Sequence, residues 1–289
     1  DGAAVVSAHG RGLAPALNAC RALPLVAVLT GAGAGAAELG AGLAGWPRRL
    51  AVAERLGTEA ERVVEVTPEQ AAAGTWADPH VVISIADGGT AAGMRADNQP
   101  AAAPAAGWAR PESAYEHRDS MITKAEVRAL AVARLAPRLG RLVWDVGAGS
   151  GSVGIECAAL GAAVVAVDAD PAATALVRAN AARHGVGCAV RVVEGDAPGV
   201  LPGLPQPDAV FVGGGGLPVL RGVVGRRPAR VVVALAALDR VAGALDLLRG
   251  NGFRTEGVQL SASRLAELPD GSVRLAAVNP VVVLSGEAG

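Results

Sequence analysis

Aromatic side chains are scarce in this chain, since Trp, Tyr and Phe together make up 2% of its 289 residues. Ala, Val and Leu must therefore supply most of the hydrophobic core. The chain is nevertheless 51% hydrophobic and 18% charged, which is typical of a globular protein and excludes a disordered one. At this length it can form two domains with sizeable cores.

An excess of charge of one sign is also lacking. The chain has 26 Lys and Arg residues against 27 Asp and Glu residues, so its formal net charge is −1. It contains no run of basic residues interleaved with aromatic ones. We therefore expect no nucleic-acid partner.

Long apolar runs and paired cysteines are missing too. The longest charge-poor run, residues 22–37, is interrupted by Pro24 and several glycines, so no membrane span is predicted, and no secretory signal pattern is visible. Cys20, Cys157 and Cys188 are odd in number and lack metal-ligand spacing, which indicates reduced, buried thiols in a cytoplasmic protein. The four histidines are scattered, so no metal site is predicted.

The most informative segment is LVWDVGAGSG, residues 142–151, in which an apolar stretch leads to an acid and then to glycines at every second position. Glycine is needed where the backbone turns tightly and approaches a ligand closely. A helix is expected from Ser152 to Leu160, and a strand from Ala163 to Val167 leads to Asp168, 21 residues after Gly147. At that distance a βαβ unit returns a carboxylate to a ribose hydroxyl, so a nucleotide-type cofactor is predicted.

Two cofactors compete for this loop. GSGSVG, residues 149–154, also satisfies the dinucleotide pattern. Asp145 favours S-adenosylmethionine, because a carboxylate there lies near the cationic methionine end of that ligand and would repel a pyrophosphate. A third strand, Ala189 to Glu194, leads to Asp196, where Rossmann-type methyltransferases commonly place an acid beside the adenine. The predicted cofactor-binding residues are Thr123, Asp145, Gly147, Gly149, Gly151, Asp168, Asp196 and Ala197.

The chain is predicted to form two α/β blocks. Residues 89–111 are rich in Gly, Ala and Pro without apolar periodicity, so a linker is expected over 89–107, between blocks at 1–88 and 108–289. Strands of the first block are expected at 3–7, 24–29, 50–53 and 81–85.

In the second block, a capping box from Thr123 to Glu126 predicts the start of a helix, with Val127, Leu130, Ala131 and Leu135 on one face. Asp170 and Pro171 begin the next helix, and Gly185 ends it. Further strands at 208–212, 230–235, 257–263 and 273–284, with a helix at 239–249, would complete a seven-stranded sheet of the Rossmann-like, class I methyltransferase type.

Several segments of this block resemble the decarboxylating methyltransferase domain of cobalamin biosynthesis. They are EHR (116–118), MITKAEVR (121–128), DVGAGSGSV (145–153), SR (263–264) and NPV (279–281), and the similarity spans roughly residues 108–287. The resemblance implies S-adenosylmethionine-dependent methylation of carbon 15 of a corrin precursor of the precorrin-6B type. It also implies loss of carbon dioxide from the acetate on ring C, in cobalamin biosynthesis.

The first block resembles the C-terminal lobe of the tetrapyrrole-methylase half of bifunctional precorrin-6Y methyltransferases, which methylates carbon 5. The segments that carry the resemblance are SAHGR (7–11), VLT (28–30) and AERLG (53–57) with ER (61–62). The amino-terminal lobe of that fold, with its own glycine loop, has no counterpart here, so an incomplete domain without methylation of carbon 5 is expected. Residues 31–35, GAGAG, have no acid ahead of them and predict a surface turn.

Candidate substrate-binding residues follow from the resemblance, which implies a substrate with many carboxylates. Arg118, Lys124 and Arg264 are candidate docking groups, and each has the alternative of a solvated surface charge. Tyr115 and His117 are weak candidates for a catalytic proton shuttle, with core packing or exposure as the alternative. The glycine run 213–216 is expected to face the substrate or to form a flexible turn.

One segment departs from the family pattern. Where the family tends to show Asn-Ala-Val-Thr-Leu-Glu, this chain has ALAALD at 234–239, without the amide or the hydroxyl. The cofactor site should survive this change, whereas substrate handling is expected to differ. Two other functions stay open: an NAD-dependent Rossmann oxidoreductase, which has no use for Asp145 and Asp196, and a non-catalytic assembly subunit. Related domains tend to assemble, so a homo-oligomer is expected.

Overall fold

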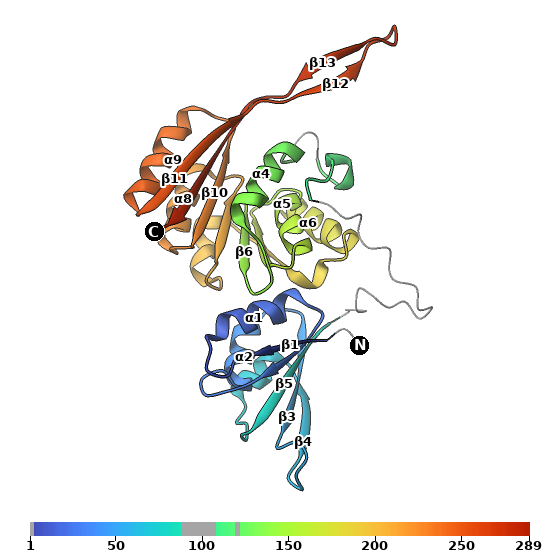
Figure 1. Cartoon of the computed structure of the whole chain (residues 1–289), viewed down its shortest axis with the longest axis vertical. Helices are drawn as coiled ribbons and strands as arrows, with labels where there is room; N and C mark the ends of the chain where they lie inside the picture. Colours follow the sequence, from blue (N-terminus) through green and yellow to red (C-terminus); the bar gives the residue numbers. More distant parts are fainter. Residues whose placement is uncertain (1–2, 88–107, 119–121) are drawn as a thin grey trace.

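A computed structural model of the chain describes residues 3–87, 108–118 and 122–289. The described residues form a five-stranded sheet, a seven-stranded sheet and a two-stranded ribbon (Figure 1). The predicted linker at 89–107 lies outside the described residues. No helix within the described residues is both long and apolar enough to cross a membrane.

The five-stranded sheet belongs to the first block. Its strands are β1 (Ala4–Ser7), β2 (Leu25–Leu29), β3 (Arg48–Glu54), β4 (Arg62–Val66) and β5 (His80–Ala86), in the order β1-β2-β5-β3-β4. Its helices are α1 (Leu13–Ala22), α2 (Ala36–Leu43) and α3 (Pro68–Ala73). The four predicted strands are confirmed, and residues 31–35 form the predicted turn before α2. The sequence analysis missed β4, a largely exposed edge strand that pairs only with β3.

The seven-stranded sheet belongs to the second block and is mostly parallel. Its strands are β6 (Leu142–Val146), β7 (Ala163–Asp168), β8 (Val190–Glu194), β9 (Ala209–Val212), β10 (Arg230–Leu235), β11 (Phe253–Leu260) and β14 (Val281–Ala288). The order across the sheet is β11-β14-β10-β9-β6-β7-β8, and only β14 runs antiparallel to its neighbours. The predicted seven-stranded Rossmann-like sheet is confirmed.

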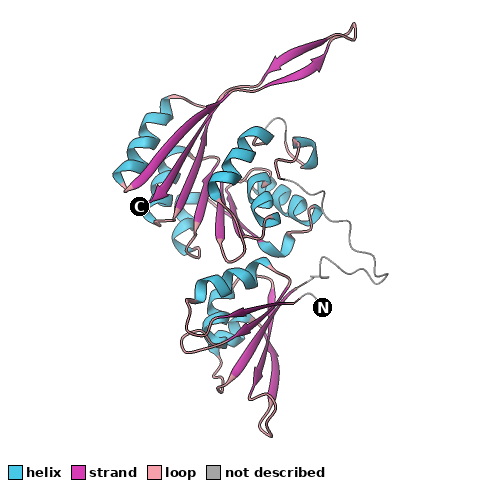
Figure 2. Cartoon of the chain, in the orientation of Figure 1, coloured by secondary structure: helices cyan, strands magenta, loops and turns pink. Residues whose placement is uncertain are grey.

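Helices cover both faces of this sheet (Figure 2). One face packs against α4 (Ala125–Leu135), α5 (Ser152–Ala159) and α6 (Pro171–Arg183), and the other against α8 (Gly216–Gly225) and α9 (Asp239–Gly250). Val143 and Trp144, neighbours on β6, belong to the cores on opposite faces. This burial on both faces explains why the central strands are continuous apolar runs.

The predicted boundaries of the two closing strands are wrong. β11 begins at Phe253, and β14 begins only at Val281, after Pro280. The segments between them form a separate antiparallel ribbon of β12 (Ser263–Glu267) and β13 (Val273–Ala277), which projects from the sheet (Figure 1). A sequence pattern of alternating residues is the same for a strand in the main sheet and for a strand in such a ribbon, so it cannot distinguish them.

The two predicted helix starts have different outcomes. Asp170 caps α6 as expected, since its carboxylate accepts a hydrogen bond from the backbone N–H of Ala172 at 2.8 Å. The prediction of a capping box at Thr123 is wrong, because α4 begins at Ala125 without a side-chain cap. The carboxylate of Glu126 instead pairs with Arg264, on the ribbon.

The first block packs directly on the second through α1. The Asn18 side-chain amide donates to the carbonyl oxygen of Gly140 at 3.1 Å and to the carboxylate of Asp208 at 3.3 Å. Arg48, which is buried, donates to the carbonyl oxygen of Cys188 at 3.1 Å. Ala22 and Trp46 also join the core beneath the seven-stranded sheet. The contact is therefore partly apolar and partly polar.

Candidate active site

The glycine loop after β6 adopts a conformation that side chains other than glycine rarely take. The φ angles of Gly147, Gly149 and Gly151 are 71°, 56° and 74°. A Cβ atom at Gly147 would lie 2.7 Å from the backbone nitrogen of Gly214. The alternating glycines are therefore required by backbone geometry as well as by the approach of a ligand.

Asp145, at the end of β6, is fully buried beneath this loop. Its Oδ2 atom accepts a hydrogen bond of 2.8 Å from the backbone N–H of Gly154, in the first turn of α5. Its Oδ1 atom is buried and has no hydrogen-bond partner among the described residues. Burial raises the pKa of this carboxyl group to about 7. An unpartnered carboxylate oxygen beside a glycine loop fits a cationic ligand group and disfavours a pyrophosphate.

Asp168, at the end of β7, faces the same loop. Its carboxylate accepts hydrogen bonds from the backbone N–H groups of Gly149, at 2.9 Å, and of Asp170, at 3.0 Å. Asp196 follows β8 and precedes the short helix α7 (Ala197–Val200), whose first residue packs against the core. The predicted acids thus lie at the ends of three adjacent strands, which is the edge where open α/β sheets bind ligands.

A second glycine run lines the neighbouring part of this edge. Residues 213–216 connect β9 to α8, and a Cβ atom at Gly213 would lie 3.1 Å from the carbonyl oxygen of Gly147. The run borders a pocket of about 210 Å³ at the carboxyl ends of β9 and β10. The structure thus places the predicted substrate-facing loop in contact with the predicted cofactor loop, residues 147–151.

The predicted docking residues have different surroundings. Arg264 forms ion pairs with Glu112 at 2.8 Å and with Glu126 at 2.8 Å. The hydrogen bond from Arg264 lowers the pKa of Glu112 to about 2. Arg118 pairs with Asp170, the cap of α6. Both guanidinium groups are thus occupied, which favours a structural role for them. Lys124 has no ion-pair partner among the described residues.

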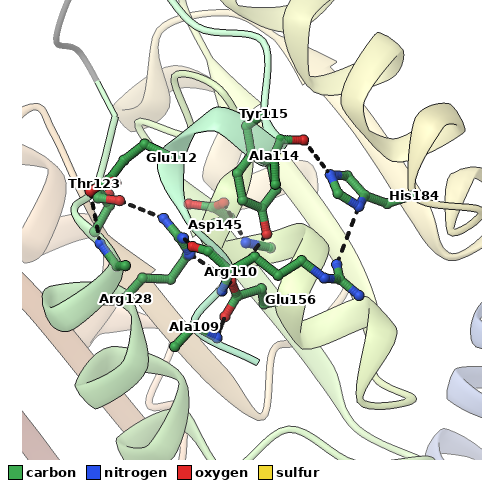
Figure 3. Close-up of polar contacts among 12 residues, drawn as sticks. Ala109, Arg110, Glu112, Ala114, Tyr115, Thr123, Arg128, Asp145, Glu156 and His184 are labelled. Carbon is green, nitrogen blue, oxygen red and sulfur yellow. Dashed lines mark hydrogen bonds and ion pairs between the residues drawn. The ribbon is translucent and has the colours of Figure 1, made fainter. Parts of the chain in front are cut away.

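Tyr115 belongs to a buried polar cluster that the sequence analysis missed (Figure 3). Its hydroxyl donates to Oε1 of Glu156 at 3.1 Å, and the guanidinium of Arg128 lies 4.9 Å from the centre of its ring. Burial and the neighbouring charge of Glu156 raise the pKa of Tyr115 to about 12. The structure therefore favours core packing for Tyr115, because its side chain is buried and its phenol stays protonated at neutral pH.

Glu156, on α5, is the centre of this cluster. Its carboxylate accepts a hydrogen bond from Nε of Arg128 at 2.7 Å, and others from the backbone N–H groups of Ala109 at 2.8 Å and Arg110 at 3.0 Å. Arg128 also donates to the carbonyl oxygen of Thr123 at 2.5 Å. One signal in the sequence pointed to this cluster, namely a lone acid within the apolar helix that follows the glycine loop.

The cluster fastens residues 109–118 beside the glycine loop. Asn180, on α6, exchanges hydrogen bonds of 2.8 Å with the backbone of Glu116 and also donates to the carbonyl oxygen of Ser150 at 2.9 Å. His184 bonds to the carbonyl oxygen of Ala114 at 2.9 Å. His117, the other weak catalytic candidate, follows Glu116 in this segment. Within the described residues, no group of three or more His, Cys, Asp or Glu side chains is arranged to hold a metal.

The fold and the loop define a class of protein. The chain resembles a crystal structure of a protein from Methanobacterium thermoautotrophicum called precorrin 8W decarboxylase, with 30% identity and a TM-score of 0.58 over 62% of this chain and 100% of that one. It also resembles the crystal structure of the C-terminal domain of precorrin-6Y C5,15-methyltransferase from Rhodobacter capsulatus, with 32% identity and a TM-score of 0.55. That match covers 62% of this chain and 97% of the other. The second block is a Rossmann-like class I methyltransferase fold.

Curated relatives identify the family. A family model described as "Precorrin methyltransferase domain" matches residues 113–252. A probable cobalt-precorrin-6B C(15)-methyltransferase (decarboxylating) from Pyrobaculum calidifontis is 36% identical over 62% of this chain and 95% of its own length. The precorrin-6Y C(5,15)-methyltransferase [decarboxylating] of Sinorhizobium is 40% identical over 74% of this chain. The match covers only 50% of the length of that relative. The chain belongs to the precorrin methyltransferase family, as the sequence resemblance predicted.

Proposed function

We propose that this chain transfers a methyl group from S-adenosylmethionine to carbon 15 of a precorrin-6B-type corrin precursor and removes carbon dioxide from its ring C acetate. This reaction belongs to cobalamin biosynthesis. The name of the Pyrobaculum relative, which this chain covers over 95% of its length, supports the position of methylation and the decarboxylation. An NAD-dependent oxidoreductase is not favoured, because the family is one of methyltransferases.

The observation that carries the proposal is the unpartnered Oδ1 atom of Asp145 beneath the glycine loop. S-adenosylmethionine carries a cationic methionine end and a ribose, and it supplies the electrophilic methyl group when bound. We assign the methionine portion to the loop glycines 147, 149 and 151, the ribose to Asp168 and the adenine to Asp196. The order of the strands supports this assignment, because the two acids follow the adjacent strands β7 and β8 at the edge where open α/β sheets bind ligands. The methyl donor and the glycine loop are therefore complementary in charge and in shape.

The residues of this chain contribute mainly by positioning. Methyl transfer from a sulfonium is an in-line displacement, so the nucleophilic carbon must be held against the methyl group. The glycine run 213–216 lets the substrate approach closely on one side, and the segment 109–118, fastened by Glu156, borders the loop on the other. Loss of carbon dioxide leaves an electron pair that the conjugated macrocycle accepts. The protein then supplies orientation and charge, and Lys124 is a candidate partner for a substrate carboxylate.

A mass-spectrometric assay tests this function. The full chain is incubated with precorrin-6B, or its cobalt form, and labelled S-adenosylmethionine, and the product is analysed for methyl groups gained and carbon dioxide lost. We expect one methyl group at carbon 15 and the loss of one carboxyl group. Calorimetry should detect S-adenosylhomocysteine binding and no NAD binding. A chain that binds S-adenosylhomocysteine but transfers no methyl group to either precursor would contradict the proposed substrate.

We also propose that the chain forms a homo-oligomer through the ribbon of β12 and β13. Leu265 and Leu275 pair with each other across the ribbon, and they are 77% and 67% exposed. A projecting ribbon with exposed leucines is an unfavourable surface in water, and its unpaired edges are suited to pairing with a second copy of the ribbon.

A further inference from the structure

The pocket at the carboxyl ends of β9 and β10 contains one charged side chain. Its lining residues are Val212, Gly213, Gly214, Gly216, Val233, Ala234, Leu235, Ala236, Ala237 and Arg240. Nine of the ten are apolar or glycine, so only backbone groups and Arg240 can form polar contacts with a ligand there. The pocket holds about 210 Å³, which is enough for a substituent of a large ring and too small for a whole tetrapyrrole.

Arg240 reaches across the pocket from the first turn of α9. Its Nη1 atom lies 3.6 Å from the position that a Cβ atom at Gly216 would occupy, at the start of α8. The residue is exposed, and its guanidinium forms no ion pair within the described part of the chain. In contrast, Arg118 and Arg264 are both paired with carboxylates. Arg240 is thus a cation at the pocket that no acid of the described residues neutralises.

The pocket adjoins the cofactor loop through backbone contact. A Cβ atom at Gly147 would lie 2.7 Å from the backbone nitrogen of Gly214, which lines the pocket. A substituent that enters the pocket therefore lies beside the glycine loop to which we assign the methyl donor. Residues 234–237, from the segment that lacks the amide and hydroxyl of the family pattern, form one wall. That loss leaves Arg240 as the polar side chain of the pocket.

We propose that Arg240 binds a carboxylate of the corrin precursor that the reaction retains, and so orients the macrocycle over the cofactor loop. This inference rests on the proposed function. A guanidinium binds a carboxylate through two parallel, charge-assisted hydrogen bonds, which fix its orientation. The carboxylate that leaves as carbon dioxide is a poor partner, because an ion pair stabilises the charge that must be dispersed. Arg240 is therefore a specificity-determining residue and takes no part in proton transfer.

Steady-state kinetics of the full chain test the assignment with three variants. Arg240→Ala should raise the KM for precorrin-6B about 10-fold to 100-fold, the loss expected for charged hydrogen bonds, and change kcat much less. Arg240→Lys should restore part of the affinity, since lysine keeps the charge without the two-pronged geometry. Arg249→Ala, which removes an exposed arginine from the other end of α9, should behave as the wild type. The Kd for S-adenosylhomocysteine should be the same in all four proteins.

The outcomes separate this inference from the proposed function. A wild-type KM in Arg240→Ala would overturn the assignment of Arg240 while leaving the reaction intact. An increase in the Kd for S-adenosylhomocysteine that matches the increase in KM would place Arg240 in the cofactor site and also overturn it. A wild-type chain that binds S-adenosylhomocysteine and leaves precorrin-6B unchanged would refute the proposed substrate, and the carboxylate subsite with it.

Discussion

Replacing Asp145 with asparagine should change how the stability of the unliganded protein depends on pH. The carboxyl group is fully buried, and one of its oxygens has no hydrogen-bond partner among the described residues. Burial raises its pKa in the folded protein to about 7, from an ordinary value of 3.8 for an aspartate. Because the folded pKa lies above the unfolded one, the folded protein holds its proton more tightly, and stability falls as pH rises from about 4 to about 7.

The size of this effect follows from the pKa. One pKa unit corresponds to about 1.4 kcal/mol. From pH 5 up to the folded pKa of about 7, the folded protein holds a proton that the unfolded chain has lost, so between pH 5 and pH 8 Asp145 alone removes about 3 kcal/mol from the free energy of unfolding. The loss is nearly complete at pH 8, where the folded group has released most of its proton. Asparagine has nearly the same shape and does not titrate. The Asp145→Asn variant should therefore lack this fall, whatever its absolute stability.

Urea denaturation of both proteins at several pH values from 5 to 8 measures the difference. Other titrating groups are common to both proteins and cancel, so the difference in unfolding free energy should grow by about 3 kcal/mol in favour of the variant over this interval. Two curves that run parallel from pH 5 to pH 8 would refute the reasoning. In the same variant, binding of S-adenosylmethionine should be weaker, because the neutral amide does not attract its cationic end.

Three further changes test the loop, the buried cluster and the ribbon. Gly149→Val should abolish binding of S-adenosylhomocysteine in calorimetry. The control Gly33→Val imposes a similar backbone strain, at φ 70° in the first block, and should leave binding intact. Equal binding by the wild type and both variants would place the cofactor elsewhere. Glu156→Gln should lower the unfolding free energy by about 3 kcal/mol or more, because Arg128 would keep a buried charge without its charged partner. Urea denaturation measures this loss, and a loss below about 1 kcal/mol would contradict the reasoning. Leu265→Ser should shift the sedimentation-equilibrium mass toward the monomer, and an unchanged mass would exclude the ribbon as the contact.

Elements with a local signal could be predicted from the sequence alone. The glycines at 147, 149 and 151 predicted the loop because only glycine adopts their positive φ angles without strain. Asp170 and Pro171 predicted the start of α6 because an N-cap and a fixed φ act within one helical turn. The apolar runs predicted the central strands because a sheet covered on both faces selects such residues.

Packing between distant segments sets which charges meet and where the closing strands divide. Glu126 was predicted to cap its own helix, but it pairs with Arg264, 138 residues later, because the ribbon brings that guanidinium to α4. Arg128 and Glu156 become partners only when α4 and α5 pack on the same face of the sheet. Arg240 meets the glycine run only at the edge where β9 and β10 end. Local patterns encode backbone angles and burial, whereas ion pairs and pockets depend on packing between residues far apart in the chain.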